Sequence, residues 1–239
     1  MDVIDYTKKF NIPDNKTAQR HSPIFPKNLF CIIAGATASG KTNLVVNLLM
    51  QKDMLNYSDV YIYSSTLYQP AYVYLKSCYE TFEKLIRNKT GQAVSIAHFC
   101  DKDDELVDPA TLPVGQNHIL VLDDVMLEDQ IKIKNFFCRG RHNNFNVIYL
   151  VQSLYKIAKH CIRENANMFI LFHQDDKTLK YFYETHISGD MPFNEFKDFC
   201  DKAWTKPHGF IVFNLWDDAF CGRYWANYKE IYTPKKYLK

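Results

Sequence analysis

One segment constrains this chain more than any other: a short apolar run that leads directly into a loop bounded by two glycines. The run covers residues 30–34, and the loop reads Gly35-Ala36-Thr37-Ala38-Ser39-Gly40-Lys41-Thr42. A helical pattern follows at residues 41–51. The spacing G-x-x-x-x-G-K-[ST] between a strand and a helix is typical of loops whose backbone amides surround a phosphate group. The sequence therefore predicts a phosphate-binding loop at residues 35–42.

The residue types in this loop match the needs of a nucleoside triphosphate. Gly35 and Gly40 permit backbone conformations that other residues disfavour, and the N-terminus of the next helix attracts anions. Lys41 supplies a positive charge for the β- and γ-phosphates, and Thr42 a hydroxyl for Mg²⁺. A glycine-rich turn without a ligand is the alternative, but the flanking strand and helix argue against it.

A second apolar strand, residues 118–122, runs into two carboxylates. We expect Asp123 to hold Mg²⁺ through its water shell near Thr42, and Asp124 to polarise the attacking water. Two aspartates after a strand are usually a turn or a helix cap, and the phosphate loop upstream favours the metal interpretation. Glu128 is the rival for the role of base, although it suits the start of the next helix better.

Gln152 is a polar residue near the end of the apolar run at residues 145–153. It is a candidate sensor of the γ-phosphate, because ligands bind at the carboxyl edge of a parallel sheet. The alternative is that Gln152 only caps the helix that follows.

Apolar runs alternate with helical patterns through most of the chain, which predicts a three-layer αβα fold with a mainly parallel central sheet. The expected strands are residues 29–34, 59–65, 118–124, 145–153 and 167–172, and the expected helices are residues 41–51, 81–88, 128–142 and 154–164. Residues 90–115 are predicted to be a surface loop.

The C-terminal part has a different pattern, with helices predicted at residues 177–186 and 193–204. Residues 210–216 and 222–227 are expected to pair as a hairpin. We therefore predict an N-terminal arm at residues 1–27 and one nucleotide-binding domain at residues 28–239. Its last part, from about residue 176, is expected to be a C-terminal β-hairpin extension of the sheet.

Composition excludes several classes. The net charge of +2 is too small for a strongly basic DNA coat protein. The seven cysteines are widely spaced without a CxxC pair, which favours reduced core thiols over zinc or disulfides. No signal peptide or membrane-length apolar run is seen. We expect a soluble protein in a reducing compartment, without membrane contact.

The nucleotide is expected to be ATP. GTPases read guanine with an Asn-Lys-x-Asp motif, and the segment Asn88-Lys89-Thr90-Gly91 lacks the final aspartate. A strand intervenes in the sequence between the loop helix and the strand before Asp123, and an acidic residue follows Asp123. Both features favour the ATPase branch that includes the RecA-like P-loop motors.

Five segments together resemble the viral genome-packaging ATPases of the FtsK–HerA superfamily, of the poxvirus, giant-virus and virophage type. The segments are residues 35–42, 119–124, 138–143 (Cys-Arg-Gly-Arg-His-Asn), 147–153 and 162–167 (Ile-Arg-Glu-Asn-Ala-Asn). The resemblance runs from about Phe30 to Phe172. One departure is Asp124, where the superfamily commonly has Glu, which puts its role as base in doubt.

The resemblance implies an ATP-hydrolysing, Mg²⁺-dependent motor that moves double-stranded DNA into a preformed capsid. It implies a homo-oligomeric ring of five or six subunits that works with the capsid vertex or other virion proteins. The protein would be virus-encoded and located in the infected-cell cytoplasm or virus factory, or in the virion. An arginine from a neighbouring subunit would reach the γ-phosphate. Candidates are Arg163, just before the fifth strand, and Arg139 and Arg141, which precede the fourth strand at the N-terminal edge of the sheet.

Contacts to DNA would be made through phosphates, because a packaging motor accepts any sequence. Candidate contacts are Lys132, Lys134, Lys156, Lys159 and the basic tail from residue 234, and the alternative is that these are solvated surface and a frayed end.

Two other functions remain open. One is a P-loop kinase for a nucleoside or nucleotide, with Arg139 and Arg141 closing over the phosphates, and the other is a nucleotide-bound assembly factor that does not hydrolyse ATP.

Overall fold

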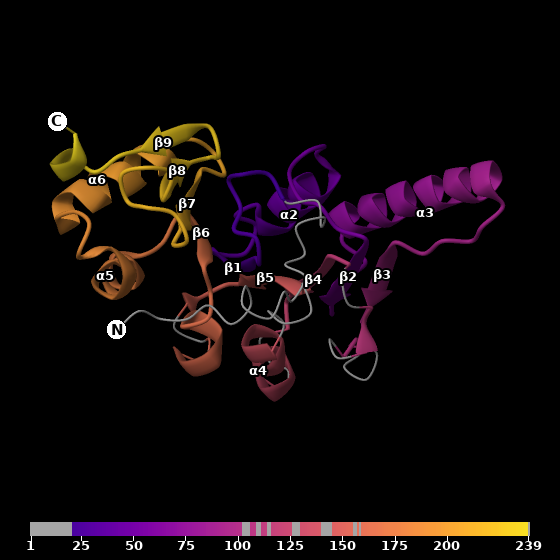
Figure 1. Cartoon of the computed structure of the whole chain (residues 1–239). Coiled ribbons are helices and arrows are strands. Elements are labelled where there is room, and N and C mark those ends of the chain that lie inside the picture. The colour runs from indigo at the N-terminus through magenta and orange to yellow at the C-terminus, as the bar shows by residue number, and fades with distance from the viewer. Residues whose placement is uncertain are drawn as a thin grey trace, which may run out of the picture.

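The chain folds around one mixed β-sheet that carries helices on both faces (Figure 1). The computed structural model describes residues 21–101, 106–108, 111–113, 116–125, 130–139, 145–154, 157 and 159–238. Its strands are β1 (Phe30–Ala34), β2 (Asp59–Ser64), β3 (Ala97–Cys100), β4 (His118–Asp123), β5 (Phe145–Val151), β6 (Met168–Phe172), β7 (Phe210–Asn214), β8 (Tyr224–Ala226) and β9 (Glu230–Tyr232). Its α-helices are α2 (Lys41–Met50), α3 (Pro70–Thr90), α4 (Gln130–Arg139), α5 (Asp176–Phe182) and α6 (Phe193–Trp204).

The strand order within this part of the chain is β3-β2-β4-β5-β1-β6-β7-β8-β9. The strands from β3 to β6 in this order pair in parallel, and β7, β8 and β9 continue the sheet as antiparallel neighbours. The predicted fold class, α/β with a mainly parallel sheet, is confirmed. So is the antiparallel pairing of the segments around residues 210–216 and 222–227.

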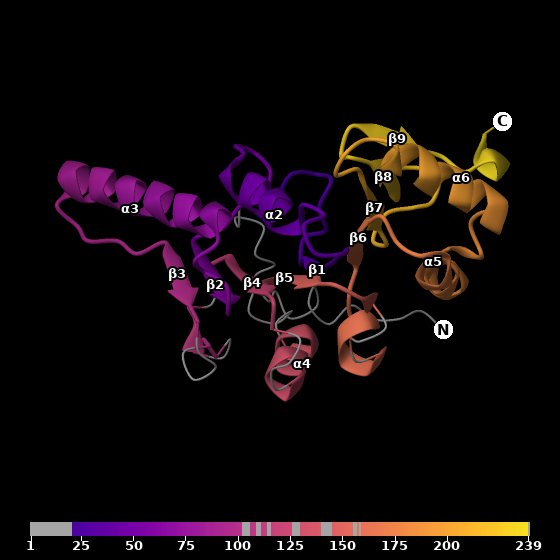
Figure 2. The same ribbon diagram turned by 180° about the vertical axis from the view of Figure 1, so that it is seen from behind.

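Both faces of the central strands are covered, which explains why their sequences are continuously apolar. Alternate residues of β1 enter two different cores: Phe30 and Ile32 pack with α4, α5 and α6, whereas Cys31 and Ile33 pack with α2 and α3. Figure 2 shows the same layers from behind, with α2 and α3 on one side of the sheet and α4 on the other.

Two asparagines hold the beginning of β1 in place between its neighbours. The Oδ1 atom of Asn146 accepts a hydrogen bond from the amide of Leu29 at 2.8 Å, and Oδ1 of Asn167 accepts one from the amide of Phe30 at 2.9 Å. These side chains satisfy backbone groups at the point where β1 enters the sheet. They help to fix the position at which the phosphate loop leaves the opposite end of β1.

The segment after β2 differs most from its prediction. Helix α3 covers 21 residues rather than residues 81–88 alone, and β3 lies inside the predicted surface loop at residues 90–115. The first half of α3 is rich in tyrosine, a weak helix former, and only Tyr72, Leu75 and Tyr79 mark a buried stripe. Strand β3 is a half-buried edge strand that pairs only with β2, so it lacks a continuous apolar run.

Two further predictions need correction, and one strand was not predicted. The helix predicted at residues 154–164 is reduced, among the residues that the structure describes there, to a kinked turn at Lys159–Arg163 in which Cys161 has φ of 73°. Strand β9 was not predicted. The cysteines are not all in the core, because Cys31 and Cys200 are buried whereas Cys138 and Cys221 are exposed. No helix in the described ranges is long and apolar enough to cross a bilayer.

Candidate active site

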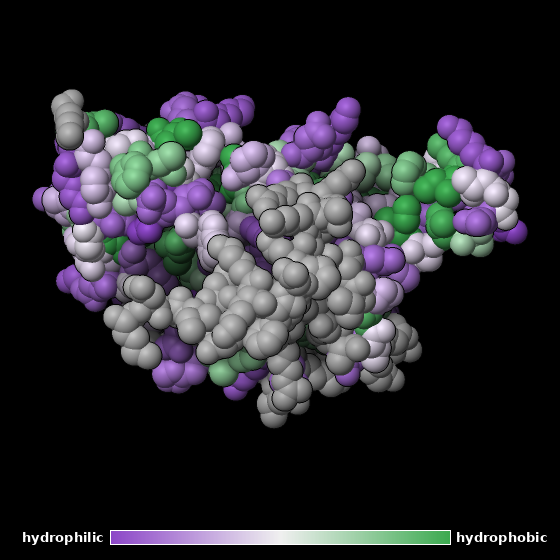
Figure 3. All heavy atoms as spheres, in the orientation of Figure 1, coloured by the Kyte–Doolittle hydropathy of each residue, from purple (hydrophilic) through white to green (hydrophobic). Residues whose placement is uncertain are grey.

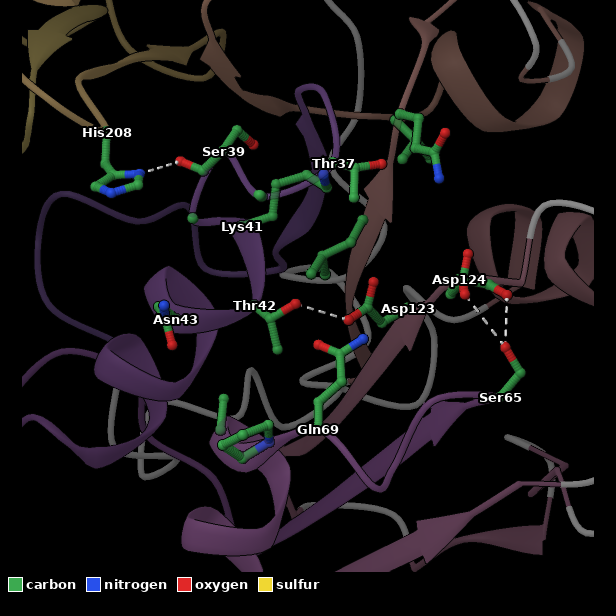
Figure 4. Close-up of a pocket in the computed structure, with 17 residues that line it drawn as sticks. Thr37, Ser39, Lys41, Thr42, Asn43, Ser65, Gln69, Asp123, Asp124 and His208 are labelled. Carbon is green, nitrogen blue, oxygen red and sulfur yellow. Dashed lines mark hydrogen bonds between the residues drawn. The ribbon is translucent and has the colours of Figure 1, made fainter.

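A pocket of about 950 Å³ opens at the carboxyl edge of the parallel strands (Figure 4). One wall is the loop between β1 and α2, and the others are the ends of β4 and β5, the start of α3, and the turn before β7. Its lining includes Thr37, Ala38, Ser39, Gly40, Lys41, Thr42, Asn43, Ser65, Gln69, Asp123, Asp124, Gln152 and His208. The fold therefore gathers the predicted loop, both aspartates and Gln152 around one cavity.

The backbone of the loop is left-handed at two positions, one of which is a glycine. Gly40 has φ of 108° and Ala38 has φ of 60°. A side chain at Gly35 would place its Cβ 2.7 Å from Cβ of Phe172, so β6 approaches the loop too closely for any other residue. Gly40 precedes α2 and offers no capping side chain, which leaves the first amides of the helix available to an anion.

Lys41 lies across the loop that it follows. Its Nζ atom donates hydrogen bonds to the carbonyl oxygens of Gly35 at 2.7 Å and Ala36 at 2.8 Å. Partial burial lowers the pKa of its ammonium group, while Asp123 and Asp124 act in the opposite direction. The ammonium group is thus positioned over the cavity, where it can meet a phosphate.

Thr42 and Asp123, which are 81 residues apart, meet at the centre of the site. The hydroxyl of Thr42 donates to Oδ2 of Asp123 at 3.0 Å. The phenol of Tyr72, on α3, donates to the same oxygen at 2.6 Å. Burial raises the pKa of Asp123, and the hydrogen bonds from Tyr72 and Thr42 and the charge of Lys41 counteract it. Burial also raises the pKa of Tyr72, so its phenol remains a donor at neutral pH.

Magnesium suits this donor set. A carboxylate and a hydroxyl are hard oxygen ligands, and Mg²⁺ is usually bound by one or two protein groups together with water and phosphate oxygens. Thr42 and Asp123 would hold the ion at the mouth of the phosphate loop. No cluster of three or more His, Cys, Asp or Glu side chains is found in the described ranges, so a metal here would depend on its nucleotide for further ligands.

Asp124 and Gln152 both face the pocket from strand ends. Asp124 is exposed, has φ of 56°, and its backbone carbonyl accepts a hydrogen bond from the hydroxyl of Ser65 at 3.2 Å. Gln152 is exposed directly after β5. Because β5 lies between β1 and β4 in the sheet, Gln152 sits between the phosphate loop and Asp123.

The sequence analysis did not predict Tyr72, Ser65 or His208 as residues of the site. Tyr72 and Ser65 flank the turn into α3, whose start the sequence did not reveal. His208 reaches the loop from the C-terminal part, and its Nδ1 atom lies 3.0 Å from the carbonyl oxygen of Ser39. The only available signal was the tyrosine stripe of α3, since nothing near residue 208 marks a binding motif.

Among the candidate arginines, Arg163 has a described side chain, and it does not line this pocket. Arg163 lies before β6, at the opposite edge of the sheet, where Nη1 donates to the hydroxyl of Tyr181 at 2.8 Å. Any role at a phosphate would therefore be in another copy of the chain. Arg141 and the side chain of Arg139 lie outside the described residues.

The candidate DNA contacts are only partly described. Lys134 is half-buried on α4, and Lys156 and the side chains of Lys132 and Lys159 lie outside the described residues, as does Glu128. The tail is anchored at Lys235, whose amide donates a hydrogen bond to Oε1 of Glu195 at 2.7 Å.

Two features of this mainly parallel αβα sheet define the P-loop NTPase fold. The phosphate loop follows β1, and Asp123 ends β4, which is separated from β1 by the single strand β5. No protein-family model matches the chain, and no curated protein matches it. Similarity is found among solved structures, at a level of identity that shows the fold alone.

Two of these are structures of the genome packaging NTPase B204 from Sulfolobus turreted icosahedral virus 2. The complex with sulfate has a TM-score of 0.52 and 13% identity, covering 87% of this chain and 98% of B204. The complex with ATP-gammaS has a TM-score of 0.50 and 14% identity, covering 83% and 96%. The fold is therefore shared with a viral genome packaging NTPase over nearly the full length of that protein.

Proposed function

We propose that this chain is a Mg²⁺-dependent ATPase that drives double-stranded DNA into a preformed viral capsid as part of a homo-oligomeric ring. One observation carries the enzymatic part: the hydroxyl of Thr42 lies 3.0 Å from the carboxylate of Asp123, beside a loop that opens a helix without a capping side chain. The packaging role is supported by the motif order from Arg139 to Asn167 and by the fold shared with B204.

The residues of the pocket would divide the work of hydrolysis. The loop amides and Lys41 bind the phosphates and neutralise the charge that develops on them. When bound at Thr42 and Asp123, Mg²⁺ supplies further positive charge. Gln152 and Asp124 lie where they can orient a water molecule toward the γ-phosphorus, and Asp124 can accept its proton. The water oxygen would bond to the γ-phosphorus as the bond from the γ-phosphorus to the β–γ bridging oxygen breaks, which would release ADP and phosphate.

The first test measures phosphate release from Mg-ATP with and without double-stranded DNA. We expect hydrolysis that rises when DNA is added and that falls at least about 100-fold in Lys41→Ala, as for the loss of a charge that stabilises the transition state. Lys202→Ala, a change on the exposed surface of α6, is the control. Robust hydrolysis that is indifferent to nucleic acid would contradict a motor. Transfer of labelled phosphate to a nucleoside would indicate a kinase, and tight binding without turnover an assembly factor.

The ring is tested by mixing subunits. If Arg163 acts at the site of a neighbour, inactive Lys41→Ala and Arg163→Ala chains should recover part of the activity at mixed interfaces. Mass measurement by light scattering, with an ATP analogue and DNA present, should show a pentamer or hexamer. A monomer under all these conditions, or no recovery on mixing, would contradict shared sites.

A further inference from the structure

His208 enters the pocket from a part of the chain that no nucleotide-binding motif covers. It lies between α6 and β7, and its Nδ1 atom is 3.0 Å from the carbonyl oxygen of Ser39. The turn that presents it is tight: His208 has φ of 56°, and a Cβ at Gly209 would lie 2.1 Å from the carbonyl oxygen of Ala203. A positive φ at a residue other than glycine is uncommon and often marks a functional position.

The two ends of the pocket are chemically different. Thr42 and Asp123 mark the end that suits the metal and the β- and γ-phosphates. In Figure 4, Asp124 lies beyond Asp123 on that side, whereas His208 lies on the far side of the phosphate loop. A triphosphate whose terminal group points toward Asp124 therefore directs its other end, which carries the nucleoside, toward His208.

The imidazole of His208 is oriented for such a contact. A backbone carbonyl can only accept a hydrogen bond, so the interaction with Ser39 places the proton of the neutral ring on Nδ1. The other nitrogen, Nε2, is then an acceptor, and it has no hydrogen-bond partner among the described residues. A ribose hydroxyl or an exocyclic amino group is the complementary donor, and the flat ring also offers a surface on which a base can stack.

We infer that His208 is a specificity-determining residue that contacts the nucleoside part of the ligand and so distinguishes a nucleoside triphosphate from an inorganic polyphosphate. This inference rests on the proposed ATPase function. The other residues that line the pocket all precede Ser153. His208 would therefore be a determinant of nucleoside binding that the C-terminal part of the chain supplies.

The experiment compares the binding of ATP with that of inorganic tripolyphosphate by calorimetry, both with Mg²⁺. We expect His208→Ala to bind ATP about tenfold more weakly, as for the loss of one hydrogen bond or stacking contact, and to bind tripolyphosphate as the wild type does. His208→Asn should give the same selective loss. Asparagine tolerates positive φ and can still donate to Ser39. The control is Lys206→Ala, two residues away and outside this pocket.

An equal loss for both ligands would overturn the inference, because it would show that His208 acts on the phosphate loop through Ser39. Unchanged binding of ATP would overturn it as well. If the wild-type chain binds neither ligand, the phosphate site itself fails, and the proposed function fails with it. Thermal melting of each variant shows whether the turn before β7 still folds.

Discussion

At the scale of single residues, the site depends on the oxygen of Asp123 that accepts two hydrogen bonds. Tyr72 donates at 2.6 Å and Thr42 at 3.0 Å. If the hydroxyl oxygen of Thr42 held a metal ion, Tyr72 would remain as the donor that positions the carboxylate of Asp123. A buried acceptor that loses such a partner pays part of its desolvation penalty.

We therefore expect Tyr72→Phe to lower ATP turnover about tenfold and to raise the Mg²⁺ concentration needed for half-maximal rate, in keeping with the loss of a hydrogen bond to a charged group. A Mg²⁺ titration of the rate, together with Mn²⁺ binding followed by electron paramagnetic resonance, measures both effects. Tyr79→Phe is the matched control, because Tyr79 is buried on the same helix but bonds to Tyr57. Equal effects of the two changes would contradict a specific role for Tyr72.

The charge of Asp123 should also influence stability without ligand. Burial raises its pKa above the ordinary value, so the folded chain binds this proton more tightly than the unfolded chain does. Ionisation of Asp123 therefore destabilises the fold above the raised pKa, and this cost disappears as the pH falls through it.

Asp123→Asn should accordingly abolish hydrolysis yet melt at an equal or higher temperature than the wild type at pH 8, with the difference shrinking as the pH is lowered. Thermal melts of both chains, without nucleotide, at pH 8 and at a series of lower pH values provide the measurement. A lower melting temperature of Asp123→Asn at pH 8 would show that the ionised carboxylate stabilises the empty site instead.

At the scale of elements, α3 is divided into two halves. Tyr72, Leu75 and Tyr79 are buried in its first half. The second half projects from the body of the molecule (Figure 3), and its Phe82 and Leu85 side chains are exposed. Helices gain most of their stability from packing of an apolar face. Amide hydrogen exchange, read by mass spectrometry, should therefore be markedly faster at residues 84–90 than at residues 73–80. Uniform protection along α3 would mean that its projecting half is covered in solution.

The sequence predicted well those elements that have a recognisable local pattern, because such a pattern can be identified without knowing which elements pack beside it. Strands β1, β4, β5 and β6 are buried on both faces and read as apolar runs, and α2 follows a recognisable loop. Strand β3 and most of α3 were missed because only one side of each is covered by the rest of the protein. Their apolar residues are therefore few, and the sequence alone does not show which side is covered. The same holds for the site: residues 35–42 and Asp123 belong to local motifs, but Tyr72 reaches Asp123, and His208 reaches the phosphate loop, only through tertiary structure.

At the scale of the whole molecule, the C-terminal strands and helices share a core with the nucleotide-binding strands. Phe182, Phe196 and Phe213 pack in the same cluster as Phe169 of β6. A chain truncated after residue 175 would leave that face of β6 in water. We expect it to be insoluble or to melt far below the full chain, as judged by soluble yield and circular dichroism. A stable truncated chain would show that the nucleotide-binding strands fold without the packing that residues 176–239 supply.

The place of β5 in the sheet has one more consequence. Neighbouring strands are about 4.8 Å apart, so β1 and β4 are separated by roughly 10 Å with β5 midway between them. A ligand that stretches from the phosphate loop to Asp124 must pass over the tip of this middle strand, and one that is a phosphate shorter need not. We therefore expect Gln152 to contact a ligand that carries a third phosphate and to make no such contact with a ligand that is one phosphate shorter.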